Sequence, residues 1–175
     1  YGFGFVWLSQ DVGNEMIFIR TFKQRLIDCT TQVWHDNVFN SSRCDFYKLF
    51  KSQLNPEKYL SIDMPFYYRK ALARFRCSSH KLKIEVGRHT NIPRENRICT
   101  FCFENVGLIV IENEFHAFFV CGRFEHTRTA LLFTWYTGRT SEFALLRLMK
   151  SENVEIIKST AIFIAALFKE YESVL

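Results

Sequence analysis

The chain has 175 residues, of which 48% are hydrophobic and 23% are charged, and its formal net charge is +5. Seven glycines and three prolines are too few for a disordered or fibrous chain, so the composition predicts one main globular domain with a sizeable core. No run reaches the roughly 18 apolar residues that a membrane helix needs, so no membrane span is expected.

Residues 1–92 are predicted to form a mainly helical region. The opening YGFGFVWLSQ has neither Met nor a basic stretch before apolar residues, so we expect a piece of a longer protein and no signal peptide. Apolar residues at three- and four-residue steps predict one long helix, or two, from Asn14 to Asn40, with Asn14 as a cap. The same spacing predicts a helix from Asp45 to Leu54, which Pro56 follows.

The later part of this region predicts a basic helix and a short strand. Pro65 favours the start of a helix that runs to about Arg74, because proline fits the first helical position. From Lys81 to Val86 apolar and charged residues alternate, which is typical of a strand. Gly87 is expected to close that strand.

The segment from Tyr67 to Arg97 holds nine cations against two acidic residues, so the whole basic excess of the chain lies there. Cations interleaved with aromatic rings can neutralise phosphates and stack on bases, although such a run can also be a solvated helix face. As candidates for phosphate contacts we take Arg74, Arg76, Lys81, Lys83, Arg88, Arg94 and Arg97, and as candidates for base stacking Phe75 and His80.

Residues 93–136 are predicted to form a small unit around cysteine and histidine residues. The run GLIVIE, residues 107–112, is β-branched and suits the second strand of a small hairpin. Asn113 is expected to start a short helix, and Gly122 to supply the left-handed turn that ends it. Arg123 to Tyr136 is a further amphipathic helix.

Four residues of this unit have the spacing of a metal site. CxxC at Cys99 and Cys102 is followed after thirteen residues by His116, and after four more by Cys121. Zinc prefers tetrahedral sulfur and nitrogen ligands, and a CxxC turn presents two thiolates to one ion. On a regular helix, residues five apart differ by about 140°, so Cys121 must lie just past the last turn to join His116. The pattern predicts a closed, structural zinc site.

Other interpretations of these residues stay open. The histidine and thiol can be buried side chains that merely follow a CxxC turn, and a thioredoxin-type redox pair lacks its βαβ surroundings. His80 and His89 are possible substitute ligands. The other three cysteines, Cys29, Cys44 and Cys77, are expected to be buried thiols.

Residues 137–175 are predicted to supply two C-terminal helices, Ser141 to Met149 and Val154 to Val174, that pack on the same core. The expected fold is therefore mainly α, with a small zinc-stabilised unit made of a hairpin and a helix. Catalytic motifs such as GxSxG, HExxH, a phosphate-binding glycine loop and paired metal-binding aspartates are missing from the sequence, so we do not expect an enzyme.

The runs RFRCSSHKLKIEVGRHTNIPRENRICTFC and IENEFHAFFVC resemble the segment downstream of the polymerase domain in polyproteins of LINE-type (non-LTR) retrotransposons. FVWLSQDVGN, RLIDCTTQVW and YKLFKS look like the sequence upstream of it, so the resemblance covers roughly residues 3 to 135. The family's zinc motif maps onto Cys99, Cys102, His116 and Cys121. Glu112-Asn113-Glu114 and Gly122 depart from the usual Glu-Asp-Glu before the histidine and proline after the last cysteine.

The resemblance implies a role in holding element RNA or target DNA during reverse transcription, and an intracellular, nuclear location. We therefore expect a non-catalytic accessory domain of a reverse transcriptase polyprotein that binds RNA or DNA and contacts the polymerase domain, with a structural Zn²⁺ and no small-molecule substrate. The alternative is a zinc-stabilised module that docks on another protein through an aromatic surface. A redox or nuclease enzyme would need a reactive thiolate or an open metal position.

Overall fold

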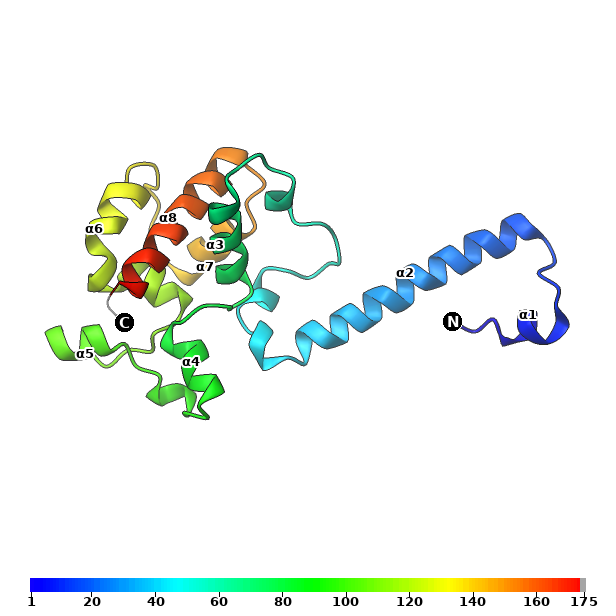
Figure 1. Ribbon diagram of the computed structural model, residues 1–175, viewed down its shortest axis with the longest axis horizontal. Coiled ribbons are helices and arrows are strands. Elements are labelled where there is room, and N and C mark those ends of the chain that lie inside the picture. Colours follow the sequence, from blue (N-terminus) through cyan, green and yellow to red (C-terminus); the bar gives the residue numbers. More distant parts are fainter. Residues whose placement is uncertain (174–175) are drawn as a thin grey trace. The chain divides into compact units, whose positions relative to one another are not determined.

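The computed structural model describes residues 1–173, and this part of the chain is mainly helical, as predicted. None of its helices is both long and apolar enough to cross a membrane. The helices are α1 Gly4–Ser9, α2 Glu15–Phe39, α3 Phe66–Arg76, α4 Lys83–His89, α5 Thr100–Val106, α6 Glu125–Thr127, α7 Glu142–Met149 and α8 Val154–Glu172 (Figure 1).

The chain forms two compact units. Residues 1–42 and 52–55 make the first unit, and residues 43–51 with those from 56 onward make the second. The boundary expected at residue 92 therefore lies inside the second unit, in which α3 packs against α8 and α4 contacts the turn at Arg94–Asn96. The regions expected at 93–136 and 137–175 also belong to this one unit.

The first unit consists of α1 and the single long helix α2. The side chain of Asn14 accepts a hydrogen bond from the backbone N–H of Ile17, which confirms the predicted cap. The ring of Phe3 lies against the rings of Phe18 and Phe22, with centroids 5.4 Å away in both cases, and so joins the N-terminal residues to the first turns of α2.

The core of the second unit lies where α3 packs against α8. Its centre is aromatic: the ring centroid of Phe118 is 4.8 Å from that of Phe163 and 5.9 Å from that of Phe75. The predicted helices over α7 and α8 are both present, and Ser141 caps α7 by accepting from the N–H of Ala144. Val174, the expected end of the last helix, lies outside the described residues.

Two elements predicted between residues 43 and 92 are wrong. The helix expected from Asp45 to Leu54 is reduced to a short 3₁₀ turn at Tyr47–Leu49; Phe46 and Phe50, on either side of it, are buried, and Phe46 packs edge-on against Phe75. The strand expected from Lys81 to Val86 is the start of α4.

Contacts distant in sequence explain why α4 is a helix. The carboxylate of Glu112 accepts the backbone N–H of Lys83, and the carbonyl of Glu112 accepts that of Ile84. Free N–H groups at the start of α4 are thus satisfied by a residue far along the chain. Gly87 lies inside this helix, where a Cβ would come within 2.6 Å of the side chain of Arg97, so glycine permits that close approach.

We predict that Phe75→Ala lowers the free energy of unfolding by about 3–5 kcal/mol, because the ring is fully buried at the centre of the core. Phe66→Ala is the matched control on the same helix, since its ring is 72% exposed, and it should change the stability by less than about 0.5 kcal/mol. Urea denaturation measures both values. Equal effects would contradict the packing described for α3.

Candidate metal centre

Four side chains converge in the interior of the second unit: Cys99, Cys102, His116 and Cys121, called the CCHC cluster below. Their ligand atoms all lie within 4.8 Å of one another, and all four residues are buried. They are the residues that the sequence spacing predicts as metal ligands. The structure therefore holds a buried cluster that could bind a metal ion.

Distances within the CCHC cluster match the size of a tetrahedral site. The Sγ of Cys121 lies 3.7 Å from the Sγ of Cys99 and 3.8 Å from that of Cys102, and the Nε2 of His116 lies 3.4 Å from the Sγ of Cys102. A tetrahedral ion with bonds of about 2.3 Å to sulfur and 2.0–2.1 Å to nitrogen separates two sulfurs by about 3.8 Å, and sulfur from nitrogen by about 3.6 Å. The three measured separations match these values, so the four atoms could hold one ion of that size. The sulfur separations exclude a disulfide, whose bond is about 2.05 Å.

A wide helical turn brings His116 and Cys121 to the same side. Residues His116–Val120 form a π-helical turn, closed by a hydrogen bond of 2.7 Å from the N–H of Cys121 to the carbonyl of His116. This bond spans five residues instead of four, so it compensates for the mismatch between a five-residue spacing and an α-helix. Cys121 lies just past the turn, as the sequence predicts.

Gly122 does not end this turn in a left-handed conformation, contrary to the expectation. Cys121 itself leaves the turn, with φ −58° and ψ 125°, and Gly122 begins the next helical segment. That segment runs through a 3₁₀ turn at Gly122–Phe124, then α6, and then a π-helical turn at Arg128–Leu132. It corresponds to the helix predicted from Arg123 to Tyr136, but it ends earlier.

The CxxC pair lies at the start of α5, with Cys99 before its first residue and Cys102 in its first turn. The predicted hairpin around this pair is reduced to one antiparallel bridge between Ile98 and Ile111. Flanking that bridge, the N–H of Cys99 donates to the carbonyl of Val110 and the N–H of Glu112 to that of Arg97. In the sequence, α5 connects the two bridged segments.

A fully buried arginine lies beside the CCHC cluster. The guanidinium of Arg128 donates to the backbone carbonyl of Cys121 from both Nη1, at 3.1 Å, and Nη2, at 2.5 Å. The carboxylate nearest to it belongs to Glu125, is 3.5 Å away and is largely exposed. Burial lowers the pKa of Arg128, while the charges of Glu125 and Cys121 oppose that shift.

A charge argument explains the place of Arg128. A divalent ion bound by three thiolates and a neutral imidazole leaves the site with a charge of −1. A buried cation is costly unless an opposite charge lies close by. The loaded CCHC cluster would supply that charge, so the arginine and the anionic site would compensate for each other. No local pattern in the sequence distinguishes Arg128 from an exposed arginine, which is why sequence reasoning missed it.

Two buried carboxylates tie the cluster region to the rest of the second unit. Glu112 accepts from the hydroxyl of Tyr171 at 2.9 Å, besides the backbone of α4. Glu114 accepts from the hydroxyl of Ser78 at 2.7 Å and lies 3.2 Å from the Nε2 of His80. Burial would raise the pKa of Glu114, but the bonds to His80 and Ser78 outweigh it, so that pKa is lowered.

Three residues expected to contact nucleic acid are instead part of the core. Phe75 is fully buried among aromatic rings, and His80 is buried against Glu114, so neither ring can stack on a base in this structure. Arg76 is buried too; its guanidinium donates to Glu57 at 2.6 Å and to the carbonyl of Met149. These three assignments are therefore corrected. Neither His80 nor His89 belongs to the cluster as a substitute ligand.

The other expected phosphate contacts divide into engaged and available cations. Arg74, Arg88 and Arg97 are half-buried and make contacts within the protein: Arg74 with Ser79 and Phe168, Arg88 with Glu85, and Arg97 with the carbonyls of Ile84 and Ile92. Lys81 and Arg94 are exposed and Lys83 is half-buried. Within residues 1–173, no hydrogen bond or ion pair engages the side chains of Lys81, Lys83 and Arg94.

The remaining cysteines do not join the cluster. Cys29 and Cys44 are half-buried, while Cys77 is exposed. The expectation that all three are buried is therefore wrong, most clearly for Cys77, which follows the last residue of α3. In the described part of the chain, His and Cys ligand atoms converge at the CCHC cluster, and these three thiols are not part of it.

We predict that the apparent affinity for a thiophilic divalent ion rises steeply with pH. In the metal-free protein, the hydrogen bond with Cys121 and burial raise the pKa of Cys99 to about 12, and burial raises that of Cys102. The ion must displace the protons of these thiols, so lower pH weakens binding, and Cys99 and Cys102 alone give at least roughly 100-fold per pH unit. Competition with a chromophoric chelator between pH 6 and 8 measures the slope. An affinity that does not vary with pH would contradict the thiol state described here.

A second prediction concerns Arg128. Arg128→Met removes the buried charge and leaves the Cys121 carbonyl without its donor, so metal affinity should fall about 10- to 100-fold. Arg128→Lys keeps the charge and should recover part of the loss, while Arg123→Met, a nearby and partly exposed arginine, serves as the control. The thiolate-to-metal absorption of the cobalt-loaded protein reports binding directly. Equal affinities of all three variants and the wild type would exclude charge compensation.

Comparison of the chain with known proteins identifies no relative. No protein-family model, curated protein or solved structure matches the chain. Within residues 1–173, the structure itself shows a mainly helical second unit with a buried CCHC cluster of the size and donor set that hold one metal ion.

Proposed function

We propose that this chain is a non-catalytic domain that binds RNA or DNA, and that a structural zinc ion in the CCHC cluster holds the surface that does so. The observation that carries the proposal is the convergence of three thiols and one imidazole nitrogen at tetrahedral spacing. Zinc suits these ligands, because thiolate and imidazole donors in a tetrahedron are its usual protein environment.

A closed site supports a structural rather than a catalytic role. All four ligands come from the protein and all are buried, so a tetrahedral ion would have no position for water or a substrate. Catalytic zinc sites keep such a position open. The ion would instead fix α5 to the turn at His116–Val120 and to the helical segment that follows.

The cluster is connected to the available cations by hydrogen bonds to the backbone around α4. Glu112, between Val110 and His116, accepts two N–H groups at the start of α4, and Arg97 spans from the bridge before Cys99 to the carbonyl of Ile84. Lys81, Lys83 and Arg94, called the basic surface below, are carried by α4 and the short turns beside it. Folding of the metal unit would therefore set the positions of these cations.

Electrostatics gives the basic surface its proposed role. Lysine and arginine neutralise phosphates and release counterions, so binding should be sensitive to salt and largely independent of sequence. The same chemistry serves RNA and DNA. The resemblance to the segment downstream of the polymerase in LINE-type retrotransposons supports a place in a reverse transcriptase polyprotein, and with it a nuclear location.

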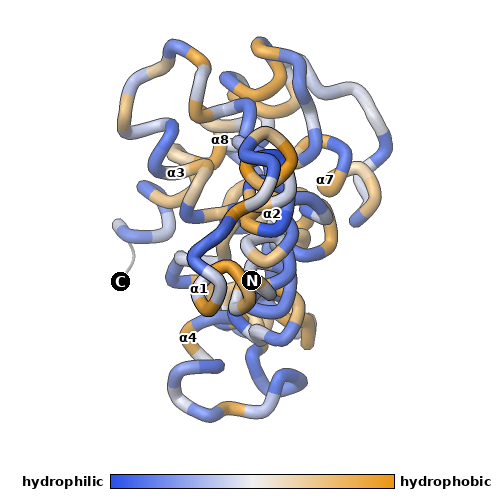
Figure 2. Tube along the Cα trace, turned by 90° about the vertical axis from the view of Figure 1, so that its right-hand side faces the viewer, coloured by the Kyte–Doolittle hydropathy of each residue, from blue (hydrophilic) through white to orange (hydrophobic). Residues whose placement is uncertain are grey.

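A second candidate function comes from the first unit. Several of its apolar side chains are mostly exposed, among them Trp7 at 80%, Leu8 at 84% and Met16 at 82%. α1 shows hydrophobic colour along its trace in Figure 2. Exposed apolar surface of this kind is typical of protein contacts, so we propose that this unit docks on a protein partner, for which the polymerase domain of the same polyprotein is the candidate.

We predict that Lys81→Glu, Lys83→Glu and Arg94→Glu together weaken binding of a short oligonucleotide at low salt by more than about tenfold. They should also lower the slope of log affinity against log salt by roughly 2 to 3, about one for each lost phosphate contact. The control reverses three exposed lysines elsewhere in the second unit, Lys58, Lys150 and Lys169. Fluorescence anisotropy at several salt concentrations separates the outcomes. Equal losses in both variants would leave the basic surface without a special role.

For the docking function, we expect Trp7→Ser with Ile17→Ser to reduce binding of the purified polymerase domain by at least about tenfold, because both side chains are exposed and apolar. Phe66→Ser removes an equally exposed ring from the second unit and should leave that binding unchanged. Calorimetric titration measures the affinities. Unaltered binding of the polymerase domain by the variant with Trp7→Ser and Ile17→Ser would contradict the docking function.

A further inference from the structure

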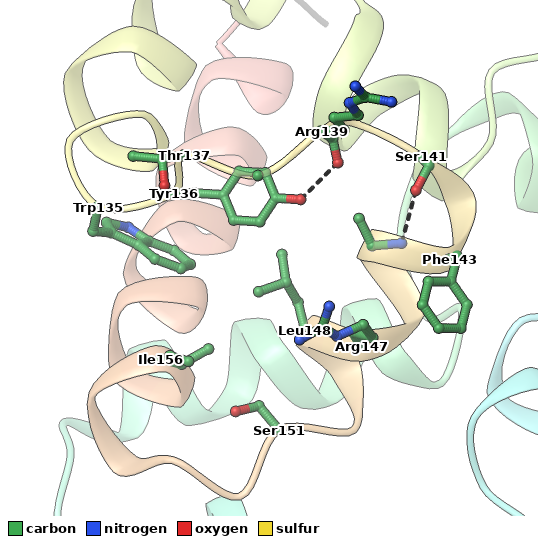
Figure 3. A pocket seen from close by; sticks show the side chains of 12 residues that line it. Trp135, Tyr136, Thr137, Arg139, Ser141, Phe143, Arg147, Leu148, Ser151 and Ile156 are labelled. Carbon is green, nitrogen blue, oxygen red and sulfur yellow. Dashed lines mark hydrogen bonds between the residues drawn. The ribbon is translucent and has the colours of Figure 1, made fainter.

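A cavity of about 680 Å³ opens in the second unit beside the loop that connects Trp135 to Ser141. α7 and the start of α8 complete its lining, and Figure 3 shows the side chains of Trp135, Arg147 and Ile156 around it. Its volume lies within the range of about 300–1,000 Å³ that is usual for small-ligand sites. Neither the CCHC cluster nor the basic surface contributes to it.

One wall of the cavity is aromatic and held in place. The ring centroid of Tyr136 lies 5.4 Å from that of Phe119 and 6.0 Å from that of Trp135. Its hydroxyl donates to the carbonyl of Arg139 at 2.8 Å, a bond drawn in Figure 3. A Cβ on Gly138 would come within 2.7 Å of that hydroxyl, so glycine lets the loop approach the hydroxyl end of the ring. The aromatic wall is thus formed before any ligand arrives.

The charge of its lining residues makes the cavity favour an anionic ligand. Arg139 and Arg147 line it, both are exposed, and no hydrogen bond or ion pair engages either guanidinium within the described residues. No aspartate or glutamate is among the lining residues. Thr137 and Ser151 add hydroxyls that can donate or accept hydrogen bonds. The cavity therefore combines flat aromatic faces with two cations that have no acidic partner.

We propose that this cavity binds one unpaired nucleotide of the nucleic-acid strand, an inference that rests on the proposed function. The base would lie against Trp135 and Tyr136, and the phosphate would lie between Arg139 and Arg147. Aromatic faces stack on any base, and the guanidinium fork matches phosphate oxygens in pairs. An acidic peptide would use the cations but not the flat aromatic wall, so a nucleotide fits the lining better.

The test compares two oligonucleotides of about 12 units, one single-stranded with bases and one abasic at its central positions, by fluorescence anisotropy. Wild-type protein should bind the strand with bases about tenfold more tightly, because stacking of one base contributes roughly that factor. Trp135→Leu and Tyr136→Leu should each reduce or remove the preference, because leucine keeps an apolar side chain but has no flat face on which a base can stack. Phe143→Ala is the control, since it removes a lining ring that is 70% exposed and is not part of the proposed stacking wall, and it should keep the preference.

Single-charge variants test the phosphate contact. Arg139→Gln and Arg147→Gln should each weaken binding of the strand with bases by about threefold to tenfold. Lys150→Gln is the matched control, since it removes one charge from an exposed residue just after α7 that does not line the cavity. An equal loss in Lys150→Gln would show a general charge effect and overturn the phosphate contact.

The outcomes separate this inference from the proposed function. Equal affinity of wild-type protein for both oligonucleotides, with binding still weakened by substitutions in the basic surface, would overturn the nucleotide cavity and leave the proposed function standing. Absence of binding to either strand at low salt would overturn both. A preference for bases that survives both Trp135→Leu and Tyr136→Leu would place base recognition elsewhere and overturn the cavity.

Discussion

The second unit depends on the convergence of three thiols and an imidazole nitrogen at one buried point. Three of their separations, 3.4–3.8 Å, are those of ligands around a single tetrahedral ion, and all four ligand atoms lie within 4.8 Å of one another. Without an ion, raised thiol pKa values keep Cys99 and Cys102 protonated. Beside them the buried Arg128 would lack a full countercharge. An ion that displaces the protons would create an anionic site next to that cation, so metal binding and folding should be coupled.

The same convergence explains how a small unit can organise a larger surface. The loop between Cys102 and His116 returns to pair with the residues before Cys99, and its Glu112 caps the start of α4. Lys81, Lys83 and Arg94 lie along the segments that these bonds hold. On the other side, Arg128 connects the cluster to the helical segment that leads to the aromatic cavity. One ion would therefore stabilise both of the surfaces proposed to contact nucleic acid.

Sequence patterns predicted what depends on residue type and local spacing. The four ligands follow from their spacing, and the long helix α2 follows from its apolar period and the Asn14 cap. The sequence patterns failed where contacts with residues distant in sequence decide whether a side chain is buried. Phe75, Arg76 and His80 lie in a basic run that reads as surface, yet α8, Glu57 and Glu114 bury them. Alternation suggested a strand at Lys81, but capping by Glu112 makes a helix, and nothing local to Arg128 indicates that it is buried.

The most direct test of this account counts metal ions. The purified chain should contain one zinc ion, by elemental analysis, and Cys102→Ser and His116→Ala should each lose both the ion and the cooperative unfolding transition. Cys77→Ser and His89→Ala change exposed residues of the same types outside the cluster, and they should keep the ion. A well-folded protein without zinc, or zinc that survives either cluster substitution, would contradict the account.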